Sequence, residues 1–303
     1  VVERGRLIEL HIRRDGDGLA AGQRGEARLK TRLGRRGIAI AAVAGEEILL
    51  EPWPDGATEG ASRIVEITRA AWREPGRDRL AKARPAIGTA TPPVSLEAQL
   101  RARGFTPASG WPDDIGDAFD EAFDDARLGR FRFEGGQLSL TPTPAFLAVD
   151  VDGAGDDLAV PALRALAAAI RLYGLGGNIV VDLPPMRARP ERLAAAAAFD
   201  ASMGTLPFER TAVNGFGLLQ IIRPRPGPSI LERARLDAAG TMAIELLRRA
   251  SLDPGTTPAV LEGPPAALGW IARRPHLVAE LARTRHRSFS LPGNLHAEPV
   301  EPA

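Results

Sequence analysis

The segment Ala145-Phe-Leu-Ala-Val-Asp-Val-Asp152 is an apolar run that ends in two carboxylates. Further along the chain, Asn178-Ile-Val-Val-Asp-Leu183 has the same character. The stretch between them, from about 161 to 173, is rich in Ala and Leu at the periodicity of an amphipathic helix. A strand–helix–strand connection of this length almost always joins parallel strands through a right-handed crossover. The sequence therefore predicts two buried parallel strands in an α/β core.

The aspartates in these runs form a candidate metal site. If the two strands are neighbours, Asp150 and Asp182 lie roughly 5 Å apart, and Asp152 points to the same face as Asp150. Converging carboxylates favour Mg²⁺, with Mn²⁺ as a substitute, and such an ion supports hydrolysis of phosphate esters. The spacing also fits aspartates that only cap loops at strand ends. As a hypothesis, Asp150 and Asp182 are predicted to be catalytic metal ligands, and Asp152 is predicted to be either a third ligand or the group that orients the attacking water.

The first ninety residues predict a β-rich region that forms a small barrel or a strongly bent sheet, because short alternating runs follow one another between glycine-containing loops. The expected strands are 6–14, 26–33, 37–43, 47–51 and 63–68. An oligonucleotide-binding barrel would align basic residues along one strand and its loop, where they would contact RNA: Arg28, Lys30, Arg32, Arg35 and Arg36. The same charges would equally serve to solvate the outer face of a sheet.

The remaining segments suggest four parts: 1–84 with the barrel, 85–129 with a linker and helices, 130–230 as the α/β core, and 231–303 as a helical end with a short strand. Pro, Gly and charged residues over 75–93 are typical of a linker. Glu134-Gly135-Gly136 predicts a hairpin. Further helices are expected at 94–103, 113–128, 189–202, 238–250, 264–273 and 276–285, and further strands at 217–222 and 288–291.

Composition excludes several function classes. The chain has no cysteine, so disulfides, thiolate nucleophiles and cysteine-ligated metals are ruled out. No apolar run is long enough to span a membrane, and the first residues lack a signal-peptide pattern, so a cytoplasmic protein is expected. All but two of the 39 basic residues are arginine, which suits RNA phosphates and bases. A GC-rich genome would also explain this bias, and the net charge is only +1.

A glycine-rich segment lies between the two predicted parallel strands. Gly174-Leu-Gly-Gly177 follows a helix and precedes a strand, whereas a phosphate-binding loop needs the opposite order. These glycines are therefore expected to end the helix. No Gly-x-Ser-x-Gly motif is present, so a serine hydrolase lacks its nucleophile.

Three blocks of the sequence resemble the RNase E/RNase G family. The segment 135–153 resembles the family segment in which a glycine pair and a Thr-x-Ala run lead into Ile-Asp-Val-Asn. The segment 170–182 resembles Leu-Arg-x-x-x-Leu-Gly-Gly-x-Ile-Val-Ile-Asp. The segment 215–225, followed by Pro228-Ser229, resembles Arg-Phe-Gly-Leu-Leu-Glu-x-x-Arg-x-Arg with its trailing Pro-Ser. The resemblance covers about residues 130–230, and more loosely 1–84.

The resemblance implies a Mg²⁺-dependent endoribonuclease that cuts single-stranded RNA and leaves a 5′-phosphate. Its catalytic core would be of the DNase I-like or RNase H-like type, after an inserted RNA-binding barrel. Asp150 and Asp182 match the two family aspartates that bind Mg²⁺, and Asp152 matches the neighbouring asparagine. Arg223, Arg225 and Asn214 are expected to contact RNA.

The chain also departs from the family pattern. Asp152 replaces a neutral amide, Pro185 stands where the family has a second aspartate, and Gly215 stands where it has an arginine. The region before residue 131 is too short for the 5′-end-sensing domain. Without the zinc-link cysteines, an oligomer could not be held by zinc. A short form of the family is thus expected, and two alternatives stay open: a non-catalytic RNA-binding protein on the same scaffold, and a Mg²⁺-dependent hydrolase of small phosphate esters.

Overall fold

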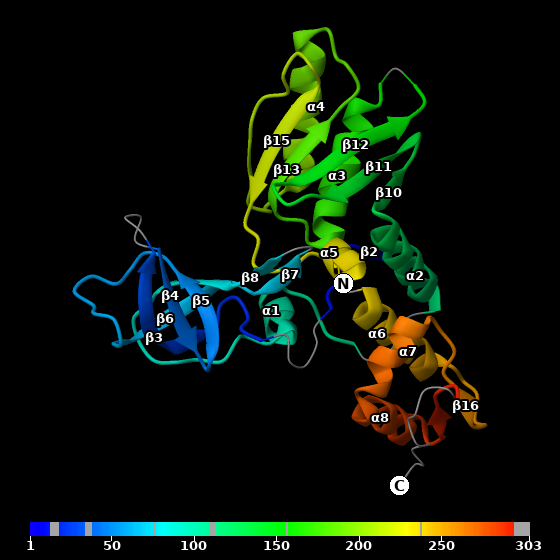
Figure 1. The fold of residues 1–303 in the computed structure, drawn as a ribbon. Coiled ribbons are helices and arrows are strands. Elements are labelled where there is room, and N and C mark those ends of the chain that lie inside the picture. The colour runs from blue at the N-terminus through cyan, green and yellow to red at the C-terminus, as the bar shows by residue number, and fades with distance from the viewer. Residues whose placement is uncertain are drawn as a thin grey trace. The chain divides into compact units, whose positions relative to one another are not determined.

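The computed structural model describes residues 1–12, 18–33, 38–74, 77–108, 113–155, 157–236 and 238–293. The chain divides into two compact units, Val1–Leu231 and Glu232–Ala303. The first unit contains a closed β-barrel and a mixed α/β core, and the second is largely helical (Figure 1). A mixed α/β fold with an N-terminal barrel is thus confirmed.

Five strands close the barrel in the order β3-β4-β5-β9-β6. Alternation explains why these segments form strands, because apolar side chains at every second position fill the barrel interior. In β4 the inward positions are Ala39, Ala41 and Val43, which are buried, whereas the intervening residues are half-buried. The strands are β3 (Arg24–Leu33), β4 (Ile38–Val43), β5 (Glu46–Leu50), β6 (Ser62–Arg69) and β9 (Ala81–Pro85).

The structure corrects two predictions in this region. Residues 75–93 are not simply a linker, because β9 lies within them and pairs in parallel with β5 and antiparallel with β6. Among the described residues of the predicted strand 6–14, only β2 (Arg6–Leu7) is a strand; it pairs with β1 (Val2–Glu3), and neither belongs to the barrel. Residues 13 and 14 lie outside the described residues. A second short hairpin joins β7 (Trp72–Glu74) to β8 (Arg77–Arg79).

The α/β core contains a six-stranded sheet in the order β10-β11-β12-β13-β15-β14. The predicted parallel pair is confirmed as β12 and β13, and every other neighbouring pair is antiparallel. The predicted hairpin is confirmed as well, since β10 turns into β11 through Glu134 and Gly135. The strands are β10 (Arg130–Phe133), β11 (Gly136–Pro142), β12 (Leu147–Gly153), β13 (Gly177–Asp182), β14 (Glu209–Arg210) and β15 (Leu218–Arg223).

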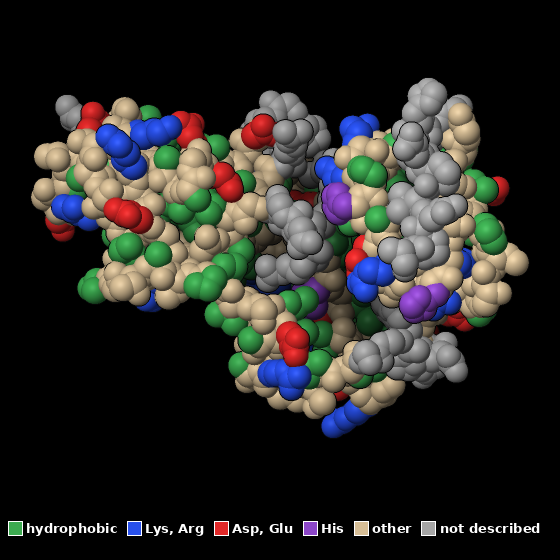
Figure 2. All heavy atoms as spheres, turned by 90° about the horizontal axis from the view of Figure 1, so that it is seen from below, with side chains coloured by type: hydrophobic (Ala, Val, Ile, Leu, Met, Phe, Trp, Pro, Cys, Tyr) green, Lys and Arg blue, Asp and Glu red, His purple; other side chains and the backbone are tan. Residues whose placement is uncertain are grey.

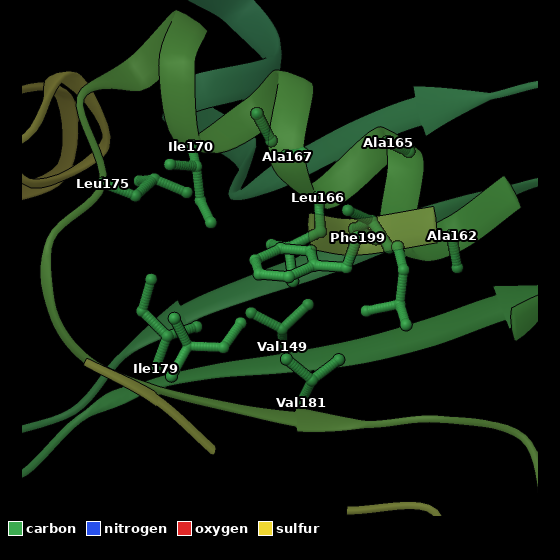
Figure 3. Close-up of a cluster of buried hydrophobic side chains, with 14 of the residues drawn as sticks. Val149, Ala162, Ala165, Leu166, Ala167, Ile170, Leu175, Ile179, Val181 and Phe199 are labelled. Atoms are coloured by element: carbon green, nitrogen blue, oxygen red, sulfur yellow. The ribbon is translucent and has the colours of Figure 1, made fainter. Parts of the chain in front are cut away.

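Two helices, α3 (Ala159–Tyr173) and α4 (Arg189–Met203), cover one face of this sheet (Figure 1). Figure 3 shows the buried cluster between these helices and the sheet, in which Val149 and Val181 of the strands face Phe199 of α4. Gly174 ends α3 in a left-handed conformation, with φ of 63°, and its N–H donates to the carbonyl of Ile170. The prediction that these glycines end the helix is confirmed.

The helices outside the core lie largely where the sequence predicts them. Two precede the sheet, α1 (Leu96–Ala102) and α2 (Asp113–Leu128). The second unit holds most of the others, which pack around buried residues such as Leu268, Ile271 and Phe289. They are α5 (Ile230–Leu236), which begins in the first unit, α6 (Ala238–Leu252), α7 (Pro265–Ala272) and α8 (Pro275–Arg285), with the short strands β16 (Ala259–Val260) and β17 (Phe289–Ser290). Within the described residues, no helix is both long and apolar enough to cross a membrane.

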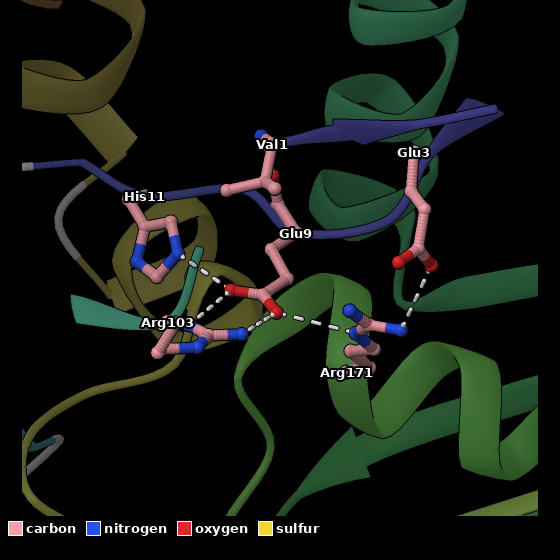
Figure 4. A network of polar contacts seen from close by, with 6 residues as sticks. All are labelled: Val1, Glu3, Glu9, His11, Arg103 and Arg171. Atoms are coloured by element: carbon pink, nitrogen blue, oxygen red, sulfur yellow. Dashed lines mark hydrogen bonds and ion pairs between the residues drawn. The ribbon is translucent and has the colours of Figure 1, made fainter. Parts of the chain in front are cut away.

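Glu9 anchors the N-terminal segment through a buried ionic cluster (Figure 4). Glu9 is only 5% exposed, and its carboxylate accepts hydrogen bonds from Arg103, Arg171 and His11. The bonds tie residues far apart in the sequence: Arg103 directly follows α1, and Arg171 lies in α3. Burial alone would raise the pKa of Glu9, but the hydrogen bonds from these three side chains outweigh it and hold the pKa well below its ordinary value of 4.5.

We expect Glu9→Gln to lower the free energy of unfolding at pH 7 by about 1–3 kcal/mol, since the variant loses charge-assisted hydrogen bonds in a buried position. A carboxylate whose pKa is lowered by folding stabilises the protein above its unfolded pKa and loses that contribution as the pH falls. The difference between wild type and variant should therefore shrink below about pH 4.5. Denaturant unfolding measured from pH 7 to pH 3 checks both effects.

The matched control for this experiment is Glu97→Gln. Glu97 pairs with Arg101 one turn away on the exposed surface of α1, so its loss should cost less than about 0.5 kcal/mol. Equal effects for the two variants, or a difference that does not change with pH, would contradict the role assigned to Glu9.

Candidate active site

Asp150 and Asp182 are brought together at the carboxyl edge of the parallel strands. The register pairs Asp150 of β12 directly with Asp182 of β13, so their Cα atoms lie one strand spacing apart, about 4.8 Å. Ser139 of β11 lies opposite Asp150, and Leu218 of β15 lies opposite Asp182. The predicted neighbourhood of the two aspartates is confirmed.

These side chains lie on the face of the sheet that the helices do not cover. Val149 and Val181, which precede the aspartates, are buried against α3 and α4, whereas Asp150 and Asp182 are exposed. Strand alternation explains the contrast, because successive side chains point to opposite faces. The side chains of this second face, which we call the open face, are exposed or half-buried, so no described segment covers it.

Asp152 lies on the open face two residues after Asp150, at a position of β12 that has no partner in β13. Its Oδ2 accepts a hydrogen bond of 3.0 Å from the Ser139 hydroxyl, while Asp150 Oδ1 accepts one of 3.0 Å from the Val151 N–H. Within the described ranges, no three His, Cys, Asp or Glu side chains gather into a metal-binding group. The arrangement therefore supplies two carboxylates in register, a donor set that suits Mg²⁺, which is commonly held by one or two carboxylates and several waters.

A tight hairpin tip lies beside Asp182 and contains Asn214. The Asn214 side-chain oxygen accepts hydrogen bonds from the N–H groups of Phe216 and Leu218, at 2.9 and 3.0 Å. Gly217 has a φ of 86°, and a Cβ there would clash with the Leu183 carbonyl oxygen, so only glycine allows the tip to pass so close to the end of β13. Asn214 thus shapes this loop, in which Phe216 is 84% exposed.

Arg223 and Arg225, which the resemblance predicts to contact RNA, lie at the other end of the sheet. Arg223 is paired with Gly177 at the start of β13, a strand length away from Asp182. Its guanidinium donates to the carbonyls of Leu175 and Pro207, and burial lowers its pKa. Arg225 lies with its guanidinium 4.3 Å from the centre of the Trp72 ring. Neither arginine joins the aspartate pair.

The barrel presents the predicted basic side chains of β3 on its outer surface. Arg28, Lys30 and Arg32 are all exposed. Lys30 forms a 2.7 Å ion pair with Glu47, and the Arg32 guanidinium lies 4.5 Å from the centre of the Trp53 ring. Arg35 and Arg36 lie outside the described residues. On the face drawn in Figure 2, acidic and basic side chains are interspersed, in keeping with the net charge of +1.

A second feature of the open face was not foreseen from the sequence. A pocket of about 480 Å³ lies on it, lined by Phe146, Asn178, Ile179, Val180, Glu209, Arg210, Thr211, Gln220, Ile221 and Ile222. The signal was present in the strand parity, because Asn178, Val180 and Asp182 are separated by two residues each and therefore share a face. The contact between Ser139 and Asp152 was also missed, since it depends on the register between β11 and β12.

No protein-family model matches the chain, and no curated protein matches it in sequence.

Proposed function

We propose that this protein is a Mg²⁺-dependent endoribonuclease that hydrolyses single-stranded RNA, related in its catalytic core to the RNase E/RNase G family. The observation that carries the proposal is the in-register pair Asp150 and Asp182 on the open face of the sheet. Two carboxylates at the carboxyl ends of parallel strands occupy the usual position of ligand sites in α/β sheets. The exposed face gives a polymer access that an enclosed cavity would not.

Asp150 and Asp182 would hold the ion, and Asp152, oriented by Ser139, would accept a hydrogen bond from the attacking water. A bound Mg²⁺ supplies charge stabilisation for the phosphodiester and lowers the pKa of a coordinated water. Hydrolysis adds water across the bond between phosphorus and the 3′ oxygen, so the products carry a 3′-hydroxyl and a 5′-phosphate. Mn²⁺ should substitute, because it accepts the same oxygen ligands.

Two further features support RNA as the polymer. Five-stranded barrels of the oligonucleotide-binding type bind single strands through their outer surface and loops, and here that surface carries Arg28 and Lys30 together with Arg32 over Trp53. The exposed Phe216 beside Asp182 offers a ring on which an unstacked base can lie. Arg35, Arg36 and Arg225 remain predicted RNA contacts, whereas the hydrogen bonds of Arg223 and Asn214 favour structural roles for these two.

One observation favours the second candidate, a non-catalytic RNA-binding protein. The Asp152 carboxylate is hydrogen-bonded to Ser139, and the described residues gather no third metal ligand around the aspartate pair. A scaffold that has lost its chemistry would bind RNA whether or not a divalent ion is present.

An assay with and without the metal distinguishes the nuclease from the RNA-binding protein and from the phosphate-ester hydrolase. Purified protein is incubated with a labelled single-stranded RNA in Mg²⁺, in Mn²⁺ and in EDTA, beside duplex RNA and p-nitrophenyl phosphate as alternative substrates. We expect endonucleolytic cleavage of the single strand in both metals and none in EDTA, restored when Mg²⁺ is added back. Binding without cleavage would replace the nuclease by the RNA-binding protein, and hydrolysis of p-nitrophenyl phosphate alone would replace it by a small phosphate-ester hydrolase.

A further inference from the structure

The pocket on the open face lies on the same surface as the aspartate pair and has a mixed lining. Its floor is apolar: Val180 is half-buried and Ile222 is 52% exposed. Phe146, which directly precedes the buried Leu147 and therefore alternates to the open face, lines it as well. Its volume of about 480 Å³ falls within the range of small-molecule sites, roughly 300–1,000 Å³.

Polar groups on the rim of this floor are free to bind a ligand. Asn178 and Gln220 are exposed, and within the described part of the chain no residue hydrogen-bonds their side-chain amides. Each amide offers both donors and an acceptor. Glu209 pairs in register with Ile222, which in turn pairs with Asn178. The carboxylate and the amide thus flank Ile222 from the two neighbouring strands.

The charge in the pocket argues against a phosphate as its occupant. Arg210, the one arginine in the lining, pairs in register with the buried Ile221, so its side chain points to the helix side. There its guanidinium makes two hydrogen bonds to the Asp200 carboxylate of α4, at 2.7 and 2.5 Å. The Glu209 carboxylate on the open face would repel an anion. An aromatic and apolar floor with hydrogen-bonding groups at its rim instead suits a flat, uncharged, polar ring.

We propose that this pocket binds a nucleobase of the RNA strand whose phosphodiester lies at Asp150 and Asp182, and that it prefers bases with an exocyclic amino group. The inference rests on the proposed function, because it takes RNA as the substrate. Asn178 and Asp182 are four residues apart on β13, which places the pocket about 13 Å from the aspartate pair along the strand.

The preference follows from Glu209. A carboxylate only accepts hydrogen bonds and therefore pairs with the exocyclic amino group of cytosine, adenine or guanine, whereas uracil has no exocyclic donor and offers only its ring N3–H between two repelling carbonyl oxygens. The apolar floor and Phe146 would contact the base faces without regard to sequence, as such contacts do in other single-strand sites. The pocket would thus contribute both affinity and discrimination.

The test measures binding in EDTA, where no cleavage is needed. Short oligoribonucleotides of cytidine, adenosine or uridine are titrated into the wild type and into Phe146→Ala, Glu209→Gln and Asn178→Ala. Thr141→Ala, an exposed open-face position outside the pocket lining, serves as the matched control. Circular dichroism verifies that each variant is folded.

We expect the cytidine and adenosine oligomers to bind about tenfold more tightly than the uridine oligomer. Glu209→Gln should bring the three affinities together, since an amide also donates to uracil oxygens, whereas Phe146→Ala should weaken all three by about tenfold. Thr141→Ala should bind as the wild type does. Equal affinities in the wild type, no binding of any oligomer, or an unchanged preference in Glu209→Gln would overturn the proposal.

The outcomes separate this inference from the nuclease itself. Selective binding by a protein that cleaves nothing in Mg²⁺ would leave the nucleobase pocket standing without the enzyme. Metal-dependent cleavage with no base preference, unaffected by Glu209→Gln, would leave the enzyme standing without the pocket.

Discussion

The Asp182→Asn variant should lose at least about 10³-fold in the rate of Mg²⁺-dependent RNA cleavage, equivalent to roughly 4 kcal/mol of transition-state stabilisation. The substitution keeps the size of the side chain but removes one of the two in-register carboxylates. A single remaining carboxylate at Asp150 would bind the ion weakly and leave it poorly positioned. Single-turnover cleavage of a labelled RNA at saturating protein measures the effect on the chemical step.

Two comparisons make this result specific. Asp117→Asn, at an exposed position on α2, removes the same charge elsewhere and should cleave at the wild-type rate. RNA binding in EDTA should be at least as tight in Asp182→Asn as in the wild type, since the substitution removes a carboxylate that repels the phosphate backbone. Cleavage by Asp182→Asn at a rate near that of Asp117→Asn would show that the aspartate pair is not the catalytic centre.

The largest effect on stability is expected for Phe199→Ala, which should lower the free energy of unfolding by about 3–5 kcal/mol. Phe199 is fully buried between α4 and the sheet (Figure 3), and its ring packs edge-on against Phe208 with centroids 5.3 Å apart. Alanine would leave a cavity in the cluster that holds α4 on the sheet. Urea denaturation followed by circular dichroism gives the difference.

The same helix provides the control for that measurement. Leu193 also lies in α4 but is 57% exposed, so Leu193→Ala should change stability by less than about 0.5 kcal/mol. If the two variants unfolded at the same urea concentration, burial of Phe199 would not be what holds α4 in place.

Strong periodicity made most of the fold predictable. In the runs that form β12 and β13, residues 145–149 and 179–181 are apolar at every position, and the helix between the two strands has a clear apolar stripe. The strand β9 was missed because its inward residues, Ala81 and Ala83, are small and its surroundings are rich in Pro, Gly and charge. Its strand character comes from pairing with β5 and β6, which no local pattern encodes.

The prediction of a long strand near the N-terminus was wrong because local alternation was misleading there. Its alternation favoured a strand through Glu9, but that carboxylate is buried because Arg103 and Arg171 provide partners from distant parts of the chain. Local patterns count a glutamate as a surface residue, and only tertiary contacts can make its burial favourable.

The candidate site was predictable only where it depends on strand order. The pairing of Asp150 with Asp182 was predicted on the condition that the two strands are neighbours, and a single crossover connection favours that arrangement. The surroundings of Arg223 were not predictable, since its hydrogen bonds go to the carbonyls of Leu175 and Pro207, which precede it by 48 and 16 residues. Asp152 shows the same limit, because its contact with Ser139 depends on how β11 aligns with β12.

The backbone of β13 fixes the spacing of the side chains on the open face. Asn178, Val180 and Asp182 occupy alternate positions of one strand, so the distances between their Cα atoms do not depend on side-chain rotation. Inserting one residue between Asn178 and Asp182 would turn one of them to the face that α3 and α4 cover. The spacing between the pocket and the aspartate pair can therefore change only in steps of two residues.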